Sequence, residues 1–189
     1  MKVGLYFGSF NPIHVGHCII ASHVVNNTDL DQLWLIVSPQ NPLKDSASLL
    51  NEYHRLHLAK IAVKDDPQIK VSDIEFHLPR PSFTIDTLTY LNEKYPQHQF
   101  SVILGSDSFQ NLARWKNSDQ LISLYDMFIY KRPGYEITIT RPNRITILDA
   151  PLLEISSTRI REYIRANKSV RFLLTENVRQ EIEDNGYYK

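Results

Sequence analysis

Residues 2–25 read KVGLYFGSFNPIHVGHCIIASHVV, and the pattern changes in the middle of this stretch. Lys2–Phe7 is a short apolar and aromatic run typical of a buried strand, whereas Cys18–Val25 is typical of the body of a helix. The turn between them, Gly8–His17, contains two glycines and two histidines three residues apart. A dinucleotide-binding fingerprint would place three glycines here, and a P-loop would end in Gly-Lys-Ser/Thr. The turn matches neither motif, so its histidines and glycines need another explanation.

The rest of the chain repeats this alternation of strand and helix. Six short runs of apolar, β-branched or aromatic residues are expected to form strands: Lys2–Phe7, Leu33–Ser38, Ile69–Ile74, Phe100–Leu104, Met127–Lys131 and Ile145–Leu148. Helical patterns separate most of them, and after Leu148 only helices are expected, in Ser156–Asn167 and Thr175–Asn185. Strands that alternate with helices predict a parallel sheet covered on both faces. The expected fold is α/β, a Rossmann-like doubly wound parallel sheet with a helical C-terminal segment.

Length and composition restrict the class of protein. A chain of 189 residues is expected to form a single domain, with an α/β core in residues 1–150 and the helical segment in residues 151–189. Lys plus Arg and Asp plus Glu both number 21, which argues against a general nucleic-acid or membrane-surface binder. The single cysteine, Cys18, rules out an internal disulfide and favours a reducing compartment. No membrane-length apolar run or signal-peptide pattern is evident, so we expect a cytoplasmic protein; a homo-oligomer is a possible assembly state.

The turn after the first strand has the features of an anion site. Gly8 and Gly16 would allow a ligand close to the backbone, and the N–H groups at the start of the following helix favour an anion. His14 and His17 are expected on the same side of the first helical turn, where both could donate hydrogen bonds to phosphate oxygens. Two alternatives are a turn with incidental histidines and a zinc site. The zinc site lacks a nearby cysteine pair or carboxylate to complete the set of ligands. No protein metal ligand is predicted.

Three other segments are compatible with the same chemistry. The stretch from Ile155 to Arg161, ISSTRIR, opens a helix with hydroxyl residues, which is ordinary capping chemistry but also suits a phosphate cradle. Lys44 lies on a loop after the second strand, and alone it is a weak signal. Gly105-Ser-Asp-Ser follows the fourth strand, and ligands of such sheets bind beyond the carboxyl ends of strands where the strand order reverses. The turns after strands one and four are therefore expected to flank one crevice.

These motifs resemble those of a known family. GSFNPIHVGH is similar to the Gly-x-Phe-x-Pro-x-His-x-Gly-His signature of the nucleotidylyltransferase superfamily, and ISSTRIR to its second signature. The segments Gly105–Trp115, Arg132–Gly134 and Pro81–Leu88 narrow the resemblance to bacterial nicotinate-nucleotide adenylyltransferases. The match is collinear from residue 2 to about Asn185.

The resemblance implies roles for individual residues. His14, His17, Lys44 and Arg161 would act on the ATP phosphates and the transition state. The residues expected to bind the rest of ATP are Gly8, Ser9, Phe10, Gly16, Gly105, Asp107, Ile155, Ser156, Ser157 and Thr158. Those expected to bind the second substrate are Thr84, Trp115, Lys116 and Arg132, with Trp115 stacking on the nicotinate ring and the Lys116 N–H on its carboxylate.

The implied reaction is transfer of AMP from ATP to nicotinate mononucleotide, giving deamido-NAD and pyrophosphate. A magnesium ion is expected, held mainly by ATP phosphates and water. Rival functions are nicotinamide-mononucleotide or phosphopantetheine adenylyltransferase, a cytidylyltransferase, and a nucleotide-binding regulator without turnover. The sequence departs from the family at four positions. Asn11 replaces an aspartate, Leu43 a histidine, Asn167 a helix-stopping glycine, and Thr175 a proline for which threonine could cap the last helix.

Overall fold

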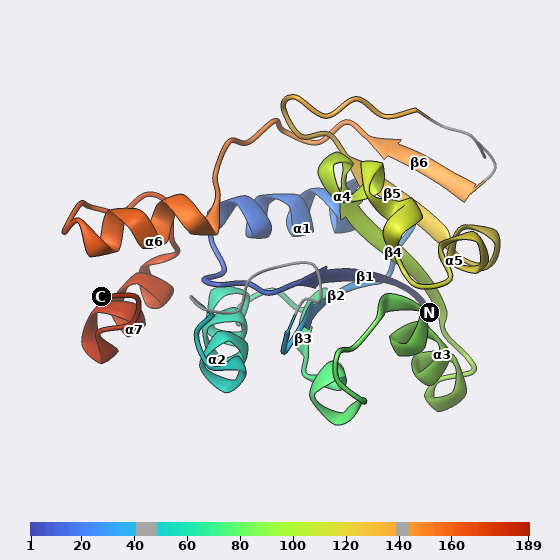
Figure 1. The fold of residues 1–189 in the computed structure, drawn as a ribbon, viewed down its shortest axis with the longest axis horizontal. Coiled ribbons are helices and arrows are strands. Elements are labelled where there is room, and N and C mark those ends of the chain that lie inside the picture. Colours follow the sequence, from blue (N-terminus) through green and yellow to red (C-terminus); the bar gives the residue numbers. More distant parts are fainter. Residues whose placement is uncertain (41–48, 139–143) are drawn as a thin grey trace.

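The fold is built on one six-stranded parallel sheet (Figure 1). The computed structural model describes residues 1–40, 49–138 and 144–189. The strands are β1 (Lys2–Gly8), β2 (Gln32–Val37), β3 (Ile69–Ser72), β4 (Gln99–Gly105), β5 (Asp126–Tyr130) and β6 (Ile145–Leu148). Their order across the sheet is β3-β2-β1-β4-β5-β6, and every neighbouring pair is parallel. The strand order therefore reverses between β1 and β4, where Tyr6 lies between Leu35 and Ile103.

Helices connect these strands and continue after the last one. The α-helices are α1 (Val15–Asn27), α2 (Glu52–Ala62), α3 (Thr84–Lys94), α4 (Ser106–Gln110), α5 (Ser118–Leu124), α6 (Ser157–Arg165) and α7 (Glu176–Asn185), and the 3-10 helices are η1 (Ile74–His77) and η2 (Leu112–Arg114). Figure 1 shows α6 and α7 together at one end of the molecule, next to α1 and α2. Within the described residues, no helix is both long enough and apolar enough to cross a membrane.

Two apolar cores cover the two faces of the sheet. Successive residues of a strand point to opposite faces, so Tyr6 joins one core while Val3 and Leu5 join the other. The first core contains side chains of α1, α2, α6 and α7, and the second contains those of α3 and α5. This arrangement confirms the predicted doubly wound sheet with a helical C-terminal segment.

The predicted strands match the observed ones to within about two residues, with one informative difference. The third strand ends at Ser72, although an apolar run to Ile74 was expected. The Ser72 hydroxyl accepts a hydrogen bond from the Ile74 amide at 3.2 Å, which turns the backbone out of the sheet and into η1. The short helices α4 and α5 were not predicted, because seven residues or fewer carry too little periodicity to identify.

Two of the four positions at which the sequence departs from the family pattern lie at the ends of the C-terminal helices. Asn167 has a φ of 51°, so it adopts the left-handed conformation expected of it after α6. Thr175 occupies the position before α7, but its hydroxyl is buried without a hydrogen-bond partner in the described part of the chain. The expectation that threonine caps α7 through its side chain is therefore wrong.

Candidate active site

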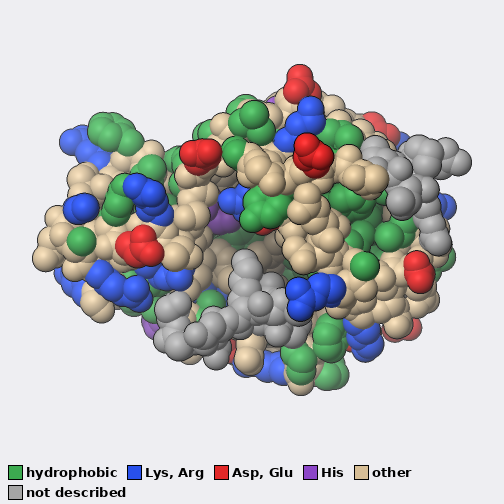
Figure 2. Space-filling model, turned by 45° about the horizontal axis from the view of Figure 1, so that its top comes forward, with side chains coloured by type: hydrophobic (Ala, Val, Ile, Leu, Met, Phe, Trp, Pro, Cys, Tyr) green, Lys and Arg blue, Asp and Glu red, His purple; other side chains and the backbone are tan. Residues whose placement is uncertain are grey.

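A pocket of about 280 Å³ lies at the point where the strand order reverses. It is bordered by the carboxyl ends of β1 and β5, the start of α1, Asp107 and Ser108 of α4, and Leu153 and residues 155–158 before and within α6. Figure 2 shows this hollow between the C-terminal helices and the α/β core, with a histidine side chain inside it. The turns after β1 and β4 thus flank one crevice, as the sequence predicted. The predicted residues that line it are Gly8, Ser9, Phe10, His14, Gly16, His17, Asp107, Arg132, Ile155, Ser156, Ser157, Thr158 and Arg161.

The turn after β1 is shaped by the ring of Phe10. Phe10 is 2% exposed and has a φ of +45°, an unusual value for a residue with a side chain. A Cβ on Gly8 would come within 2.9 Å of the Phe10 ring, so glycine is required where the ring folds back. The same ring meets His17 edge-on, with centroids 5.0 Å apart. Phe10 was predicted to line the site through its backbone, and its ring additionally supports His17.

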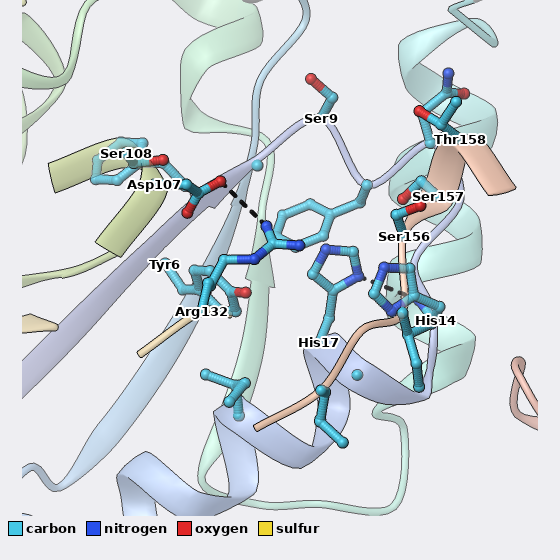
Figure 3. Close-up of a pocket in the computed structure, with 18 of the residues that line it drawn as sticks. Tyr6, Ser9, His14, His17, Asp107, Ser108, Arg132, Ser156, Ser157 and Thr158 are labelled. Atoms are coloured by element: carbon cyan, nitrogen blue, oxygen red, sulfur yellow. Dashed lines mark hydrogen bonds and ion pairs between the residues drawn. The ribbon is translucent and has the colours of Figure 1, made fainter. Parts of the chain in front are cut away.

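His14 and His17 form a stacked pair at the mouth of α1. Their ring centroids are 3.7 Å apart at 23°, and His17 Nδ1 accepts a 3.3 Å hydrogen bond from the His14 backbone N–H (Figure 3). His14 is 6% exposed, and its Nδ1 has no hydrogen-bond partner among the described residues. Burial and, to a lesser extent, the nearby Arg132 lower the His14 pKa from 6.5 to about 4. His14 is therefore a neutral imidazole at pH 7.

The backbone at the start of α1 differs from what the sequence suggested. The Val15 N–H donates to Leu173 O at 3.0 Å, and the His17 N–H donates to His14 O at 2.9 Å. These two amides were expected to be open to an anion and are instead used within the protein. The attraction for a phosphate at this turn therefore depends mainly on side chains.

Arg132 supplies a positive charge on the other side of the pocket. Its Nη1 lies 3.2 Å from Asp107 Oδ2, and Figure 3 shows the guanidinium between Asp107 and His17. Asp107 Oδ1 is buried and has no hydrogen-bond partner in the described residues. Gly105 lies behind this pair and does not line the pocket, and a Cβ there would come within 2.4 Å of Asp107 Oδ1. The structure thus places Gly105 as the residue that leaves room for Asp107 and Arg132.

The start of α6 is fastened to the turn after β1. Ser157 Oγ donates to Pro12 O at 2.9 Å, and Arg161 Nη1 donates to Asn11 O at 2.8 Å. Ser156 Oγ accepts from the Arg159 N–H at 3.3 Å and caps the helix. The capping interpretation of this motif is therefore confirmed for Ser156, and the segment also lines the pocket, where its role as a phosphate cradle stays a prediction.

Three of the four residues predicted for the nicotinate side, Thr84, Trp115 and Lys116, lie outside the described pocket lining, whereas Arg132 is part of it. Lys116 Nζ is 2.8 Å from Asp86 in the first turn of α3, and it also lies 4.9 Å from the centroid of the Phe83 ring. These contacts bring Lys116 next to the start of α3, where Thr84 lies. Trp115 is half-buried against the second core. Lys44 and Leu43 fall outside the described residues, and the predicted substrate contacts of all these residues stay predictions.

Reasoning from the sequence missed several residues that shape the site. Tyr6 and Tyr130, at the ends of β1 and β5, line the pocket and share a 3.0 Å hydroxyl–hydroxyl hydrogen bond. Arg55 and Glu75 are fully or nearly fully buried and do not line the pocket. The two tyrosines look like ordinary strand residues in the sequence. The two charged residues look like solvated positions of a helix and a loop.

Among the described residues, no group of three histidine, cysteine or acidic side chains could hold a metal ion. The described lining of the pocket contains one carboxylate, that of Asp107, and it faces Arg132. A magnesium ion that carries most of its ligands with it, as phosphate oxygens and water, fits such a lining better than a protein-held metal does.

Comparisons with known proteins agree with this geometry. A family model described as cytidylyltransferase-like matches residues 5–163. A protein of Cytophaga hutchinsonii named "Probable nicotinate-nucleotide adenylyltransferase" is 46% identical over 189 residues, covering 100% of this chain and 98% of that protein. A protein of the same name from Flavobacterium psychrophilum is 45% identical over 192 residues, covering 100% of both chains.

A solved structure supports the fold independently. The Plasmodium falciparum nicotinic acid mononucleotide adenylyltransferase complexed with NaAD superposes with a TM-score of 0.86 at 20% identity, covering 99% of this chain and 97% of that one. At that identity the likeness speaks for the fold alone. The relatives more than 40% identical along the whole chain identify the family: the chain belongs to the nicotinate-nucleotide adenylyltransferases within the cytidylyltransferase-like family.

Proposed function

We propose that the enzyme transfers AMP from ATP to the phosphate of nicotinate mononucleotide, giving deamido-NAD and pyrophosphate in NAD biosynthesis. The observation that carries this proposal is the stacked pair of His14 and His17 in the pocket where the strand order reverses. The names of the full-length relatives support the reaction, and the titles of the Plasmodium complexes, with NaAD and with APC, support nucleotide ligands for this fold.

The reaction needs no covalent intermediate, because the phosphate of nicotinate mononucleotide is already a competent nucleophile at neutral pH. Catalysis then consists of aligning attacker and leaving group and stabilising the charge that develops on the phosphoryl oxygens. Cys18 is an unsuitable nucleophile, since it is partly buried against the first core and burial raises its pKa to about 11.

Each side of the pocket contributes to the alignment. His14 and His17 donate hydrogen bonds to the α-phosphate region, where neutral His14 can take up positive charge as the phosphate approaches. Arg161 and Arg132, which both line the pocket, provide positive charge. Asp107, which lines the pocket beside Arg132, would accept a hydrogen bond from a ribose hydroxyl. Trp115 and Thr84 receive the nicotinate ring near the start of α3.

Magnesium is part of this proposal. Bound to ATP, it would neutralise phosphate charge and assist departure of pyrophosphate. We expect the pocket to hold the ion indirectly, through the ATP phosphates that its residues bind. Asp107 is the one carboxylate in the described lining that could face the ion. We also propose a cytoplasmic location, which the single cysteine supports.

A pyrophosphate-release assay tests the proposal directly. ATP is supplied with nicotinate mononucleotide, nicotinamide mononucleotide or phosphopantetheine in parallel reactions. We expect the highest kcat/KM with nicotinate mononucleotide. A higher value with either of the other acceptors would assign a different adenylyltransferase reaction, and no release with any of them would indicate a nucleotide-binding protein without turnover.

A further inference from the structure

Arg55 of α2 is a fully buried cation whose hydrogen-bond partners among the described residues are all backbone carbonyls. Its Nη1 donates to Ser9 O at 2.6 Å and to Ser38 O at 2.7 Å, its Nη2 to Pro39 O at 2.8 Å, and its Nε to Leu50 O at 2.7 Å. In the described part of the chain, no ion pair joins Arg55 to a carboxylate. A buried charge is costly unless polar groups satisfy it. Here the four carbonyls do so, and they belong to the turn after β1, the end of β2 and the start of α2.

Glu75 in η1 is the matching buried anion. It is 2% exposed, and its carboxylate accepts hydrogen bonds from Ser82 Oγ and Thr87 Oγ1, both at 2.9 Å. The Ser38 hydroxyl also hydrogen-bonds it. Burial raises the pKa of Glu75, and the three hydroxyls oppose that rise. None of the cations in the described residues forms an ion pair with it. The hydroxyls come from the end of β2, the loop before α3 and α3 itself.

Ser38 is the residue that the two buried charges share. Its carbonyl accepts from Arg55, its hydroxyl bonds Glu75, and its N–H donates to Gly8 O at 2.9 Å. A continuous series of buried hydrogen bonds therefore runs from Ser9 through Arg55, Ser38 and Glu75 to Thr87. One end is the turn that carries the histidine pair. The other end is the start of α3, where Thr84 lies next to Lys116.

We infer that Arg55, Ser38 and Glu75 are positioning residues that hold the ATP-phosphate turn and the nicotinate-binding start of α3 at a fixed separation. The inference rests on the proposed function, because it assigns one substrate to each end of the network. In-line transfer between two bound substrates is sensitive to misplacement on the order of 1 Å. Neither Arg55 nor Glu75 lines the described pocket, so neither touches the reacting atoms.

The way these hydrogen bonds are distributed over separate segments argues for a role beyond general packing. Apolar residues of similar size would often stabilise a core as well as buried charges do. The two charges are not paired with each other, and each is divided among three separate segments. Beyond Ser38, the partners of Glu75 within residues 1–40, 49–138 and 144–189 are Ser82 and Thr87, both on the nicotinate side. Loss of these bonds should therefore weaken the use of nicotinate mononucleotide selectively, whereas a purely structural role would lower stability without favouring either substrate.

The mildest test removes a single hydroxyl from α3. Thr87→Val deletes the hydrogen bond to Glu75 while keeping the side-chain shape. Thr89→Val is the matched control, because the one partner of Thr89 Oγ1 in the described structure is Ile85 O in its own helix. For Thr87→Val we expect the KM for nicotinate mononucleotide to rise roughly threefold to tenfold, with the KM for ATP within about twofold of the parent value. Thr89→Val should leave both constants unchanged. Ser82→Ala should act in the same direction as Thr87→Val.

Larger changes at the shared residues extend the test. Glu75→Met removes every acceptor, and Glu75→Gln restores one, so Gln should recover part of the KM for nicotinate mononucleotide. Ser38→Ala keeps the backbone bonds and removes only the link to Glu75, so its effect should match that of Thr87→Val. If Glu75→Met does not fold, Thr87→Val and Ser82→Ala still test whether the network has a positioning role.

Two failures can be told apart. If the parent enzyme releases no pyrophosphate from ATP and nicotinate mononucleotide, the proposed function is wrong and the inference falls with it. If the parent enzyme turns over but Thr87→Val behaves like Thr89→Val, or raises both KM values in parallel, only the positioning role is wrong.

Discussion

At the scale of single residues, His17 has the most demanding task. Its ring is held by the His14 backbone N–H, by stacking on His14 and by the edge of Phe10. Removal of one preorganised donor to a developing charge typically lowers kcat about 10²–10³-fold. We therefore expect His17→Ala to lower kcat by at least that factor, measured by pyrophosphate release, with an unchanged circular dichroism spectrum. Near-normal turnover of a folded variant would remove the histidine pair from the mechanism.

His14 should leave a signature in stability as well as in activity. Its pKa is lowered from 6.5 to about 4 in the folded protein, so between these values the unfolded chain binds more protons at this residue. The free energy of unfolding must then decrease as the pH falls through this window, by about 2 kcal/mol between pH 7 and pH 5 from His14 alone. Urea unfolding of the parent protein and of His14→Asn at the two pH values measures the contribution of His14 to this pH dependence. Equal pH dependence of the two proteins would mean that His14 is not held neutral.

The residue scale also shows where sequence reasoning stops. The two histidines could be predicted, because a spacing of three places them on one side of a helical turn whatever the surrounding fold. Arg55 could not be predicted. Its four acceptors come from residues 9, 38, 39 and 50, and only the assembled sheet brings them together. An arginine within an amphipathic helix pattern looks solvent-exposed until these partners are known.

At the scale of elements, the strands were predictable and the helix ends were less so. Apolar runs of four to seven residues mark the buried strands, because both faces of a parallel sheet are covered. Helix ends depend on which hydroxyl finds a partner. Ser156 caps α6 and Ser157 reaches Pro12, whereas the Thr175 hydroxyl before α7 is buried without a partner in the described residues.

This contrast between helix ends gives a prediction. Ser157→Ala removes the hydrogen bond that fastens α6 to the phosphate turn, and it should lower the free energy of unfolding by about 1 kcal/mol and raise the KM for ATP. Thr175→Val is the matched change, because it removes a hydroxyl that bonds nothing in the described structure. It should leave stability equal or slightly higher. Chemical denaturation of both variants checks the pair, and a larger loss for Thr175→Val would contradict the assignment.

The segment after α4 gives a second prediction at this scale. Trp115 is half-buried against the second core next to Lys116, which is tied to the start of α3. Loss of ring stacking should raise the KM for nicotinate mononucleotide roughly tenfold in Trp115→Ala, with a much smaller effect on ATP. Trp34→Ala is the control, since Trp34 packs against the same core through Tyr95 and Phe100. Steady-state kinetics with each substrate varied distinguishes the two, and equal losses for both substrates would point to packing alone.

At the scale of the whole molecule, the C-terminal helices are part of the core on which the site is built. Ile160, Val178 and Ile182 belong to the same apolar cluster as residues of α1, α2 and β2. Tyr187 and His54 share a 2.9 Å hydrogen bond that also joins the C-terminal end to α2. The sequence predicted one domain from length alone, and this shared core is the physical reason to expect a single cooperative unfolding unit.

That expectation can be measured through Ile182, which is 2% exposed. Ile182→Ala leaves a cavity in the shared core and should lower the free energy of unfolding of the entire protein by about 2–5 kcal/mol. Because the cluster spans both parts of the chain, calorimetry should still show one transition, shifted to lower temperature. Phe172→Ala is the control, since Phe172 is 86% exposed and its loss should leave the transition unchanged. A separate low-temperature transition in Ile182→Ala would instead show that α6 and α7 unfold independently, and the anchoring of α6 to the phosphate turn would then be too weak to organise the site.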